Sequence, residues 1–160
     1  MTTLQSAVRR RRAVAAAGAV SAGLLVLSAC DKPTAMATVT VGSDSVSSEA
    51  TCGGEGKALT TEALNKCLQD KDIDEIEVDP LETVRFGVDP EIADNSWTIL
   101  LNGQPLVDPM KNNTYQSIPG SVFFNAQYGA QGDSTLVSIK EGGEDEATGL
   151  WSFRLKKDEG

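Results

Sequence analysis

Residues 137–155 read VSIKEGGEDEATGLWSFRL, in which two segments of alternating apolar and polar residues flank an acidic stretch that contains glycines. The apolar residues of the two segments recur at every second position: Val137, Ile139, Trp151, Phe153 and Leu155. Successive side chains point to opposite faces of a β-strand, so this period predicts two half-buried strands. Residues 141–146 are then expected to form an acidic hairpin loop between them.

The same period of two continues toward the N-terminus. Its apolar positions are Val39, Val41, Ile76, Val78, Val84, Phe86, Val88, Trp97, Ile99, Leu101, Val122 and Phe124. A weaker strand is expected around residues 45–50, and Asn102-Gly103 is a residue pair typical of a tight hairpin turn. Seven or so short strands, separated mostly by glycine, proline, aspartate or asparagine, predict an all-β domain.

This pattern favours a β-sandwich, and within that class an immunoglobulin-like arrangement. Its predicted core comprises Val39, Phe86, Trp97, Ile99, Phe124, Ile139, Trp151 and Phe153. A cupredoxin-like sandwich is the structural alternative, although a chain without histidine lacks the usual ligand for copper.

One short helix is expected over residues 59–69. Thr60 is a suitable N-cap residue, and Leu59 and Leu64 have the spacing of a hydrophobic staple around it. Leu64, Cys67 and Leu68 share one helical face, so Cys67 is expected to point toward the domain.

The first 29 residues have the composition of an export signal. Four arginines at residues 9–12 precede an uncharged run at residues 13–27, which is shorter than the ~20 residues that span a bilayer. Leu27-Ser28-Ala29-Cys30 then resembles the lipobox of bacterial lipoproteins. The resemblance implies that Cys30 receives a diacylglyceryl thioether, with fatty acyl chains such as palmitate, and becomes the mature N-terminus.

The predicted organisation is a lipoprotein signal peptide at residues 1–29, a lipidated tether at residues 30–37 and a β-sandwich domain at residues 38–160. The protein is then expected on the extracytoplasmic face of the cell membrane, where two acyl chains give a stable anchor. A retained anchor helix and an ordinary secretory signal are the alternatives.

The acidic and basic residues are distributed unevenly on the two sides of the predicted cleavage site. All 23 acidic residues follow it, with ten of the 14 basic residues, so the mature chain carries a net charge of −13. A chain this acidic repels phosphate backbones and anionic headgroups. Nucleic acid is therefore not an expected partner, and membrane attachment is expected through lipid on Cys30 rather than through a basic patch.

The two remaining cysteines, Cys52 and Cys67, are expected to form a structural disulfide in an oxidising compartment. Closing a loop of about 16 residues is worth ~3 kcal/mol on the chain-entropy model. A redox pair or a metal site is the alternative, but the close C-x-x-C spacing and a set of four ligands are both missing from the sequence.

The residue inventory favours a protein that is not an enzyme and needs no cofactor. With no histidine, the sequence cannot supply a Ser-His-Asp triad, a Cys-His pair or a histidine zinc site. Neither a P-loop nor a G-x-G-x-x-G fingerprint is present. Paired carboxylates could hydrolyse a glycan, with Glu91, Asp94 and Asp108 as candidates in expected loops.

Two further groups of residues have a structural and a functional interpretation. Asp70, Asp72 and Asp74 match the start of a calcium loop, but Glu75 and Leu81 depart from the EF-hand pattern. A solvated acidic strand entry is the preferred interpretation, with a looser calcium site as the alternative. Among the aromatic residues, Trp97 and Trp151 fit core positions better than a sugar-binding platform, and Tyr115 and Tyr128 are the better candidates for exposed rings.

Residues 84–94 read VRFGVDPEIAD. With the arginine-led, alanine-rich signal and the lipobox, this run is similar to the small lipoproteins of unknown function that are common in actinobacteria, the high-GC Gram-positive bacteria. The resemblance implies a cell-surface location and carries over no active-site residues.

The expected function is a non-catalytic binding or accessory module of the cell envelope, with an envelope protein or a cell-wall component as its partner. A lipoprotein that captures a solute or glycan for a transporter is one alternative. A hydrolase that uses carboxylates is the other.

Overall fold

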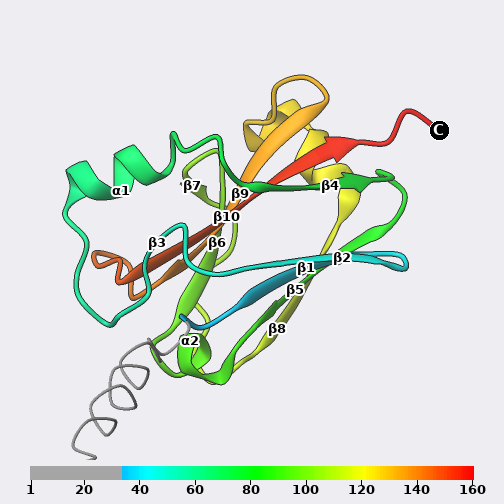
Figure 1. Ribbon diagram of the computed structural model, residues 1–160. Coiled ribbons are helices and arrows are strands. Elements are labelled where there is room, and N and C mark those ends of the chain that lie inside the picture. Colours follow the sequence, from blue (N-terminus) through cyan, green and yellow to red (C-terminus); the bar gives the residue numbers. More distant parts are fainter. Residues whose placement is uncertain (1–33) are drawn as a thin grey trace, which may run out of the picture. The chain divides into compact units, whose positions relative to one another are not determined.

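Two β-sheets packed face to face make up residues 34–160, the part of the chain that the computed structural model describes (Figure 1). The first sheet has the strand order β2-β1-β5-β8. Its strands are β1 (Ala37–Val41), β2 (Asp44–Ser48), β5 (Thr83–Val88) and β8 (Tyr115–Pro119). The predicted signal peptide and Cys30 lie outside the described residues.

The second sheet has the order β3-β10-β9-β6-β7, and β4 also pairs with β10. Its strands are β3 (Cys52–Gly53), β4 (Asp74–Val78), β6 (Trp97–Leu101), β7 (Gln104–Pro105), β9 (Ser134–Glu141) and β10 (Gly149–Lys157). The β4–β10 pair is parallel and the other pairs are antiparallel. The predicted all-β class is confirmed, and so is the expectation that two sheets form the domain.

The expected count of about seven strands is wrong, because residues 34–160 contain ten. Two of the additional strands, β3 and β7, are only two residues long. The third, β8, was missed because only Ile118 among its five residues is buried, so it shows no apolar alternation. Such a pattern is typical of a strand at the edge of a sheet.

The expectation of a single helix is also wrong. Besides α1 (Thr61–Cys67), the described residues contain α2 (Pro90–Asp94) and two 3-10 helices, η1 (Gly120–Phe124) and η2 (Ala126–Tyr128). The predicted strand through Val122 and Phe124 is η1 instead. Its tighter turn buries Phe123 completely, with its ring centroid 5.8 Å from that of Phe86, and leaves Phe124 only partly buried.

The core lies between the two sheets and contains every predicted core residue except Phe124. Trp97 and Trp151 have no exposed surface, which excludes them as a sugar-binding platform. Their indole N–H groups donate to the backbone carbonyls of Asn113, at 2.6 Å, and Ala35, at 2.8 Å. A buried indole needs such a partner, so both rings are held in fixed positions in the core.

The Asn102-Gly103 hairpin is confirmed. Both residues have positive φ angles, 48° and 82°, as a type I′ turn requires, and they join β6 to β7 with Leu101 opposite Gln104.

The last residues of the predicted tether belong to the folded domain. Thr34 accepts a hydrogen bond from the backbone N–H of Ala50 at 3.3 Å, and the backbone N–H of Met36 donates to the Asp89 carboxylate at 2.8 Å. Strand β1 begins at Ala37, so the ordered domain starts no later than residue 34.

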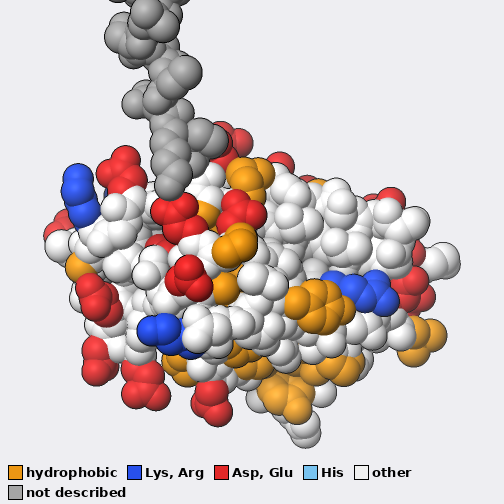
Figure 2. Space-filling view, turned by 90° about the horizontal axis from the view of Figure 1, so that it is seen from below, with side chains coloured by type: hydrophobic (Ala, Val, Ile, Leu, Met, Phe, Trp, Pro, Cys, Tyr) orange, Lys and Arg blue, Asp and Glu red, His pale blue; other side chains and the backbone are white. Residues whose placement is uncertain are grey.

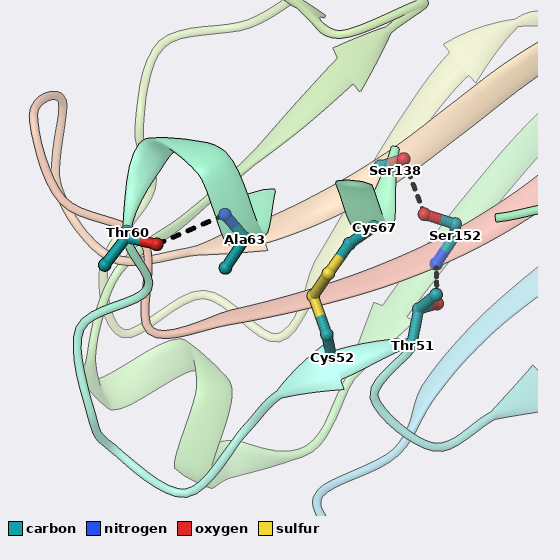
Figure 3. The surroundings of a disulfide bond; sticks show 7 residues. All are labelled: Thr51, Cys52, Thr60, Ala63, Cys67, Ser138 and Ser152. Carbon is teal, nitrogen blue, oxygen red and sulfur yellow. Dashed lines mark hydrogen bonds between the residues drawn. A yellow bond between two sulfur atoms is a disulfide. The ribbon is translucent and has the colours of Figure 1, made fainter. Parts of the chain in front are cut away.

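The predicted disulfide joins Cys52 in β3 to Cys67 at the end of α1, with 6.3 Å between the two Cα atoms (Figure 3). Thr60 caps α1 as expected, because its side chain accepts a hydrogen bond from the backbone N–H of Ala63 at 3.2 Å. No residue of α1 is fully buried. The disulfide is therefore the strongest connection between this helix and the sandwich.

Candidate binding surface

The two outer faces of the sandwich differ in exposure. On the second sheet, six of the side chains that point away from the core are buried as well: Thr98, Leu100, Ser138, Lys140, Leu150 and Ser152. Farther along the same face, the ion-paired side chains of Glu75, Arg154 and Lys156 are partly exposed. The segment around α1 and the loop after β9 lie over this face, because Leu59, Leu64 and Glu146 line one small hollow together with Lys140 (Figure 1). This part of the outer face of the second sheet, which we call the covered face, is thus covered by the chain itself.

Lys140 holds the loop that follows β9. Its ammonium group donates to three backbone carbonyls, at 2.5 Å for Gly143 and 3.2 Å each for Glu144 and Glu146. Burial lowers the pKa of Lys140 below its ordinary value of 10.5, and the nearby Asp145 and Glu144 carboxylates offset part of that shift. With its donors occupied by the loop, this lysine has a structural role.

The other buried polar groups of the second sheet are also satisfied. The hydroxyls of Ser138 and Ser152 bond to each other at 2.8 Å. The carboxylate of Glu141 accepts from the Asn95 amide at 2.9 Å and from the Thr148 hydroxyl at 2.8 Å. Within residues 34–160 no buried side-chain nitrogen or oxygen lacks a hydrogen-bond partner. The covered face therefore leaves no polar group that requires a ligand.

The calcium alternative gains no support from the geometry. Asp70, Asp72 and Asp74 line one hollow of about 320 Å³ together with Glu49. No three of the acidic and cysteine side chains among the described residues come together as a metal-binding group. The preferred interpretation, a solvated acidic entry to β4, agrees with the exposure of all three aspartates.

The hollows near α1 and β7 are lined by polar as well as apolar side chains. The larger, of about 540 Å³, lies against α1 and is lined by Thr51, Ala63, Lys66, Cys67, Gln69 and Asp70. The other, of about 250 Å³, is lined by Thr98, Pro105, Val107, Asp108, Pro109, Lys140 and Glu144. Sites for small molecules are usually predominantly apolar with a few polar groups, and the lining surface of both hollows has that composition. The capture of a solute therefore stays an alternative to the binding of an envelope component.

Two of the three acids considered for hydrolysis, Glu91 and Asp94, lie one helical turn apart on α2, and the third, Asp108, lies in the segment after β7. All three are exposed. Glu141 is the one carboxylate among residues 34–160 that is buried, so the described residues contain no buried acid pair. Hydrolysis by paired acids stays an untested alternative.

The outer face of the first sheet is open, and its side chains form two rows across the four strands. The strand register sets Ser47, Thr38, Gly87 and Tyr115 side by side in the first row. It sets Ser45, Thr40, Arg85 and Ser117 side by side in the second. These eight residues, which we call the hydroxyl face, present five hydroxyl side chains, one arginine and one tyrosine.

The hydroxyl face carries no carboxylate, although the described domain is strongly acidic. Its one charged side chain, Arg85, is exposed and forms no ion pair with any other described residue. Figure 2 views the molecule from the side on which the first sheet lies in Figure 1. Red acidic side chains gather mainly toward the left of that view, orange hydrophobic side chains are scattered over its middle and right, and the white of the backbone and the other side chains covers much of the rest.

Tyr115 is the large aromatic side chain of this face, with 50% of its surface exposed. Its backbone is fixed by the pairing with Gly87 and by a 3.1 Å hydrogen bond from its N–H to the Asn113 side chain. A Cβ atom built at Gly87 would meet nothing within 4 Å, so there is open space beside the tyrosine.

The sequence identified Tyr115 and Tyr128 as candidates for exposed rings, and both are half exposed. It did not identify the face to which Tyr115 belongs. The available signal was the alternation of hydroxyl residues with valine, at Thr38 and Thr40 around Val39 and at Ser45 and Ser47 around Val46.

No protein-family model, curated protein or solved structure matches the chain significantly. The helices within residues 34–160 are all too short or too polar to cross a membrane.

Proposed function

We propose that the protein is a lipid-anchored extracytoplasmic module of the actinobacterial cell envelope that works by binding rather than by catalysis. The observation that carries the proposal is the contrast between the two outer faces of the sandwich. One face is covered over much of its area by the segment around α1 and by the loop after β9, and its buried polar groups are satisfied. The other is open, free of carboxylates and held by regular strand pairing.

The composition of the hydroxyl face suits recognition. Tyrosine and arginine are both enriched among the residues that dominate binding energy, and Arg85 forms no ion pair within residues 34–160. Since the rest of the domain is acidic, a surface without carboxylates can admit an anionic group that the other surfaces would repel.

The lipid anchor in this proposal depends on the sequence. The arginines at residues 9–12, the apolar run and Leu27-Ser28-Ala29-Cys30 support it. A tether that ends by residue 34 would hold the domain close to the membrane, because a few extended residues span little more than ~10 Å.

The fold belongs, in our proposal, to the immunoglobulin-like class of sandwiches. In such domains strands B and E are neighbours in one sheet, and strands G, F and C follow one another in the other. The order β5-β8 and the order β10-β9-β6 fit this arrangement, with β1 in the place of strand A. Trp97 then lies on strand C, as the characteristic tryptophan does, whereas the Cys52–Cys67 disulfide takes a different position from the usual one.

In-cell crosslinking of the tagged chain, followed by mass spectrometry of what it captures, tests the function. We expect an envelope component at stoichiometric yield, captured by the anchored chain but not by a Cys30→Ala variant. Capture that is equal for both variants would contradict a role that depends on the anchor. If a folded, abundant chain captures nothing, neither protein nor glycan, the binding proposal fails.

A further inference from the structure

The hydroxyl face differs in composition from the surfaces that bind proteins, small molecules or nucleic acids. Protein interfaces have an apolar and aromatic centre and are depleted in serine, whereas three of the eight residues here are serines. Small-molecule sites are concave, and this face is the flat surface of a sheet. Nucleic acid is bound through several basic groups that contact successive phosphates, and this face offers a single arginine.

From these residues we infer that the hydroxyl face binds a polysaccharide chain of the cell envelope. The inference rests on the proposed binding function and names the chemistry of the partner. Each serine and threonine hydroxyl can both donate and accept a hydrogen bond, as each sugar hydroxyl can. A flat array of such groups gains affinity from many weak contacts along an extended polymer.

Tyr115 provides the stacking position. Its ring has an apolar face that can cover the C–H face of a sugar, and a hydroxyl that stays in water. Gly87 lies directly beside it in the strand register, with no atom within 4 Å of where a Cβ would be. A sugar ring, which is about as wide as the spacing of ~4.8 Å between strands, can occupy that space next to the tyrosine.

The remaining groups extend the site along the two rows. Beyond Gly87 in the first row, the hydroxyls of Thr38 and Ser47 bond to each other at 2.7 Å, which fixes their positions for a ligand. In the second row Arg85 lies between Thr40 and Ser117, where its guanidinium can donate to sugar oxygens or to the carboxylate of an acidic sugar.

The test uses the full-length chain, purified in detergent, in native gels cast with a soluble polysaccharide. Mannan serves as the neutral polymer and polygalacturonate as the anionic one, and co-sedimentation with protein-free wall glycan from the producing bacterium covers insoluble ligands. The wild-type chain should be retarded or sedimented by at least one of the three. If polygalacturonate binds more tightly than mannan and Arg85→Gln removes the difference, the ligand is anionic; otherwise it is neutral.

Two variants locate the site. Tyr115→Ala removes the stacking ring and should weaken binding about tenfold, which corresponds to one good aromatic contact. Gly87→Val fills the adjacent space and should weaken binding to a similar extent, while a β-branched residue favours the strand and should not destabilise the fold. Tyr128→Ala is the matched control, because Tyr128 is exposed to a similar degree, 52%, but lies in η2.

Binding that Tyr115→Ala and Gly87→Val both weaken, and that Tyr128→Ala leaves within twofold of wild type, supports the inference. Binding unchanged by Tyr115→Ala and Gly87→Val in chains that remain folded overturns it. So does the absence of binding to all three preparations. If crosslinking nevertheless captures an envelope protein that depends on the anchor, the binding function stands and only the polysaccharide inference fails; if crosslinking also captures nothing, both fail.

Discussion

The hydroxyl oxygens of Ser138 and Ser152 lie 2.8 Å apart, on neighbouring positions of β9 and β10, in a site that no solvent reaches. The backbone N–H of Ser152 also donates to the Thr51 hydroxyl at 3.0 Å, so this pair connects β10 to the segment that leads into β3 (Figure 3). The two serines show how closely the second sheet is covered, because isolated hydroxyls on an outer face would normally bond to water.

Replacing only one serine of this pair should lower the free energy of unfolding by more than the hydrogen bond itself contributes, because the other hydroxyl stays buried. Ser152→Ala leaves the Ser138 hydroxyl buried without its partner, which should lower the free energy of unfolding by about 1–2 kcal/mol. Chemical denaturation of Ser138→Ala, Ser152→Ala and the double variant measures this. The double variant should be less destabilised than the sum of the two single variants; strict additivity would show that the hydroxyls are not coupled.

Loss of the disulfide should loosen α1 and destabilise the domain. The double variant Cys52→Ser/Cys67→Ser should lose about 3 kcal/mol of unfolding free energy, since the bond closes a short loop in the unfolded chain. With no residue of α1 fully buried, hydrogen exchange of its backbone amides should accelerate more than that of β9. Wild-type protein unfolded without reductant should show no free thiol at either position, and two titratable thiols there would contradict the bond.

The sequence predicted the strands that carry apolar alternation. β1, β5 and the two segments of residues 137–155 bury the expected residues, because one face of each strand contacts the core. The edge strand β8 escaped prediction, because a strand that buries one side chain has no period to detect.

The burial of Ser138 and Lys140 could not be predicted from alternation. A polar residue between two apolar ones indicates a position on the solvent-facing side of the sheet. Both residues do lie on that side, but the segment around α1 and the loop after β9 cover them. The apolar alternation of a strand does not reveal which other segments pack over it. The hydroxyl face escaped prediction for a related reason: its two rows depend on the register between four strands that are distant in sequence.

Because of Lys140, the stability of the domain is expected to depend on pH in the alkaline range. Its pKa in the folded chain is lowered by burial, whereas the unfolded chain keeps the ordinary value of 10.5. Between these two pKa values the unfolded chain binds more protons than the folded chain, so stability rises with pH through that interval. Below the folded pKa, the cost of burying the ammonium group is fully present.

The comparison with Lys140→Met isolates this contribution from that of other groups that titrate at alkaline pH. The stability of the wild type relative to the variant should increase as pH rises toward 10.5, measured by urea denaturation at a series of pH values. A relative stability that falls over the same range would mean that the loop carbonyls and the Glu144 and Asp145 carboxylates stabilise the charged form more than burial disfavours it.

The last prediction concerns the lipid anchor, which would be attached through the single thiol of Cys30. Cys30→Ala removes the atom that would carry the lipid, so the variant should leave the membrane fraction for the soluble or secreted fraction. Two acyl chains hold a protein durably at ~0.8 kcal/mol per buried methylene, whereas an acidic domain has no basic patch to replace them. Membrane fractionation followed by immunoblotting measures the shift.

The Cys52→Ser/Cys67→Ser variant is the matched control, since it removes the other two thiols and keeps Cys30. It should remain in the membrane fraction, and mass spectrometry of its N-terminal peptide should find a lipid-modified cysteine at residue 30. If Cys30→Ala stays as membrane-bound as the wild type, the lipobox interpretation is wrong, and attachment must come from the retained apolar run at residues 13–27 or from a membrane partner.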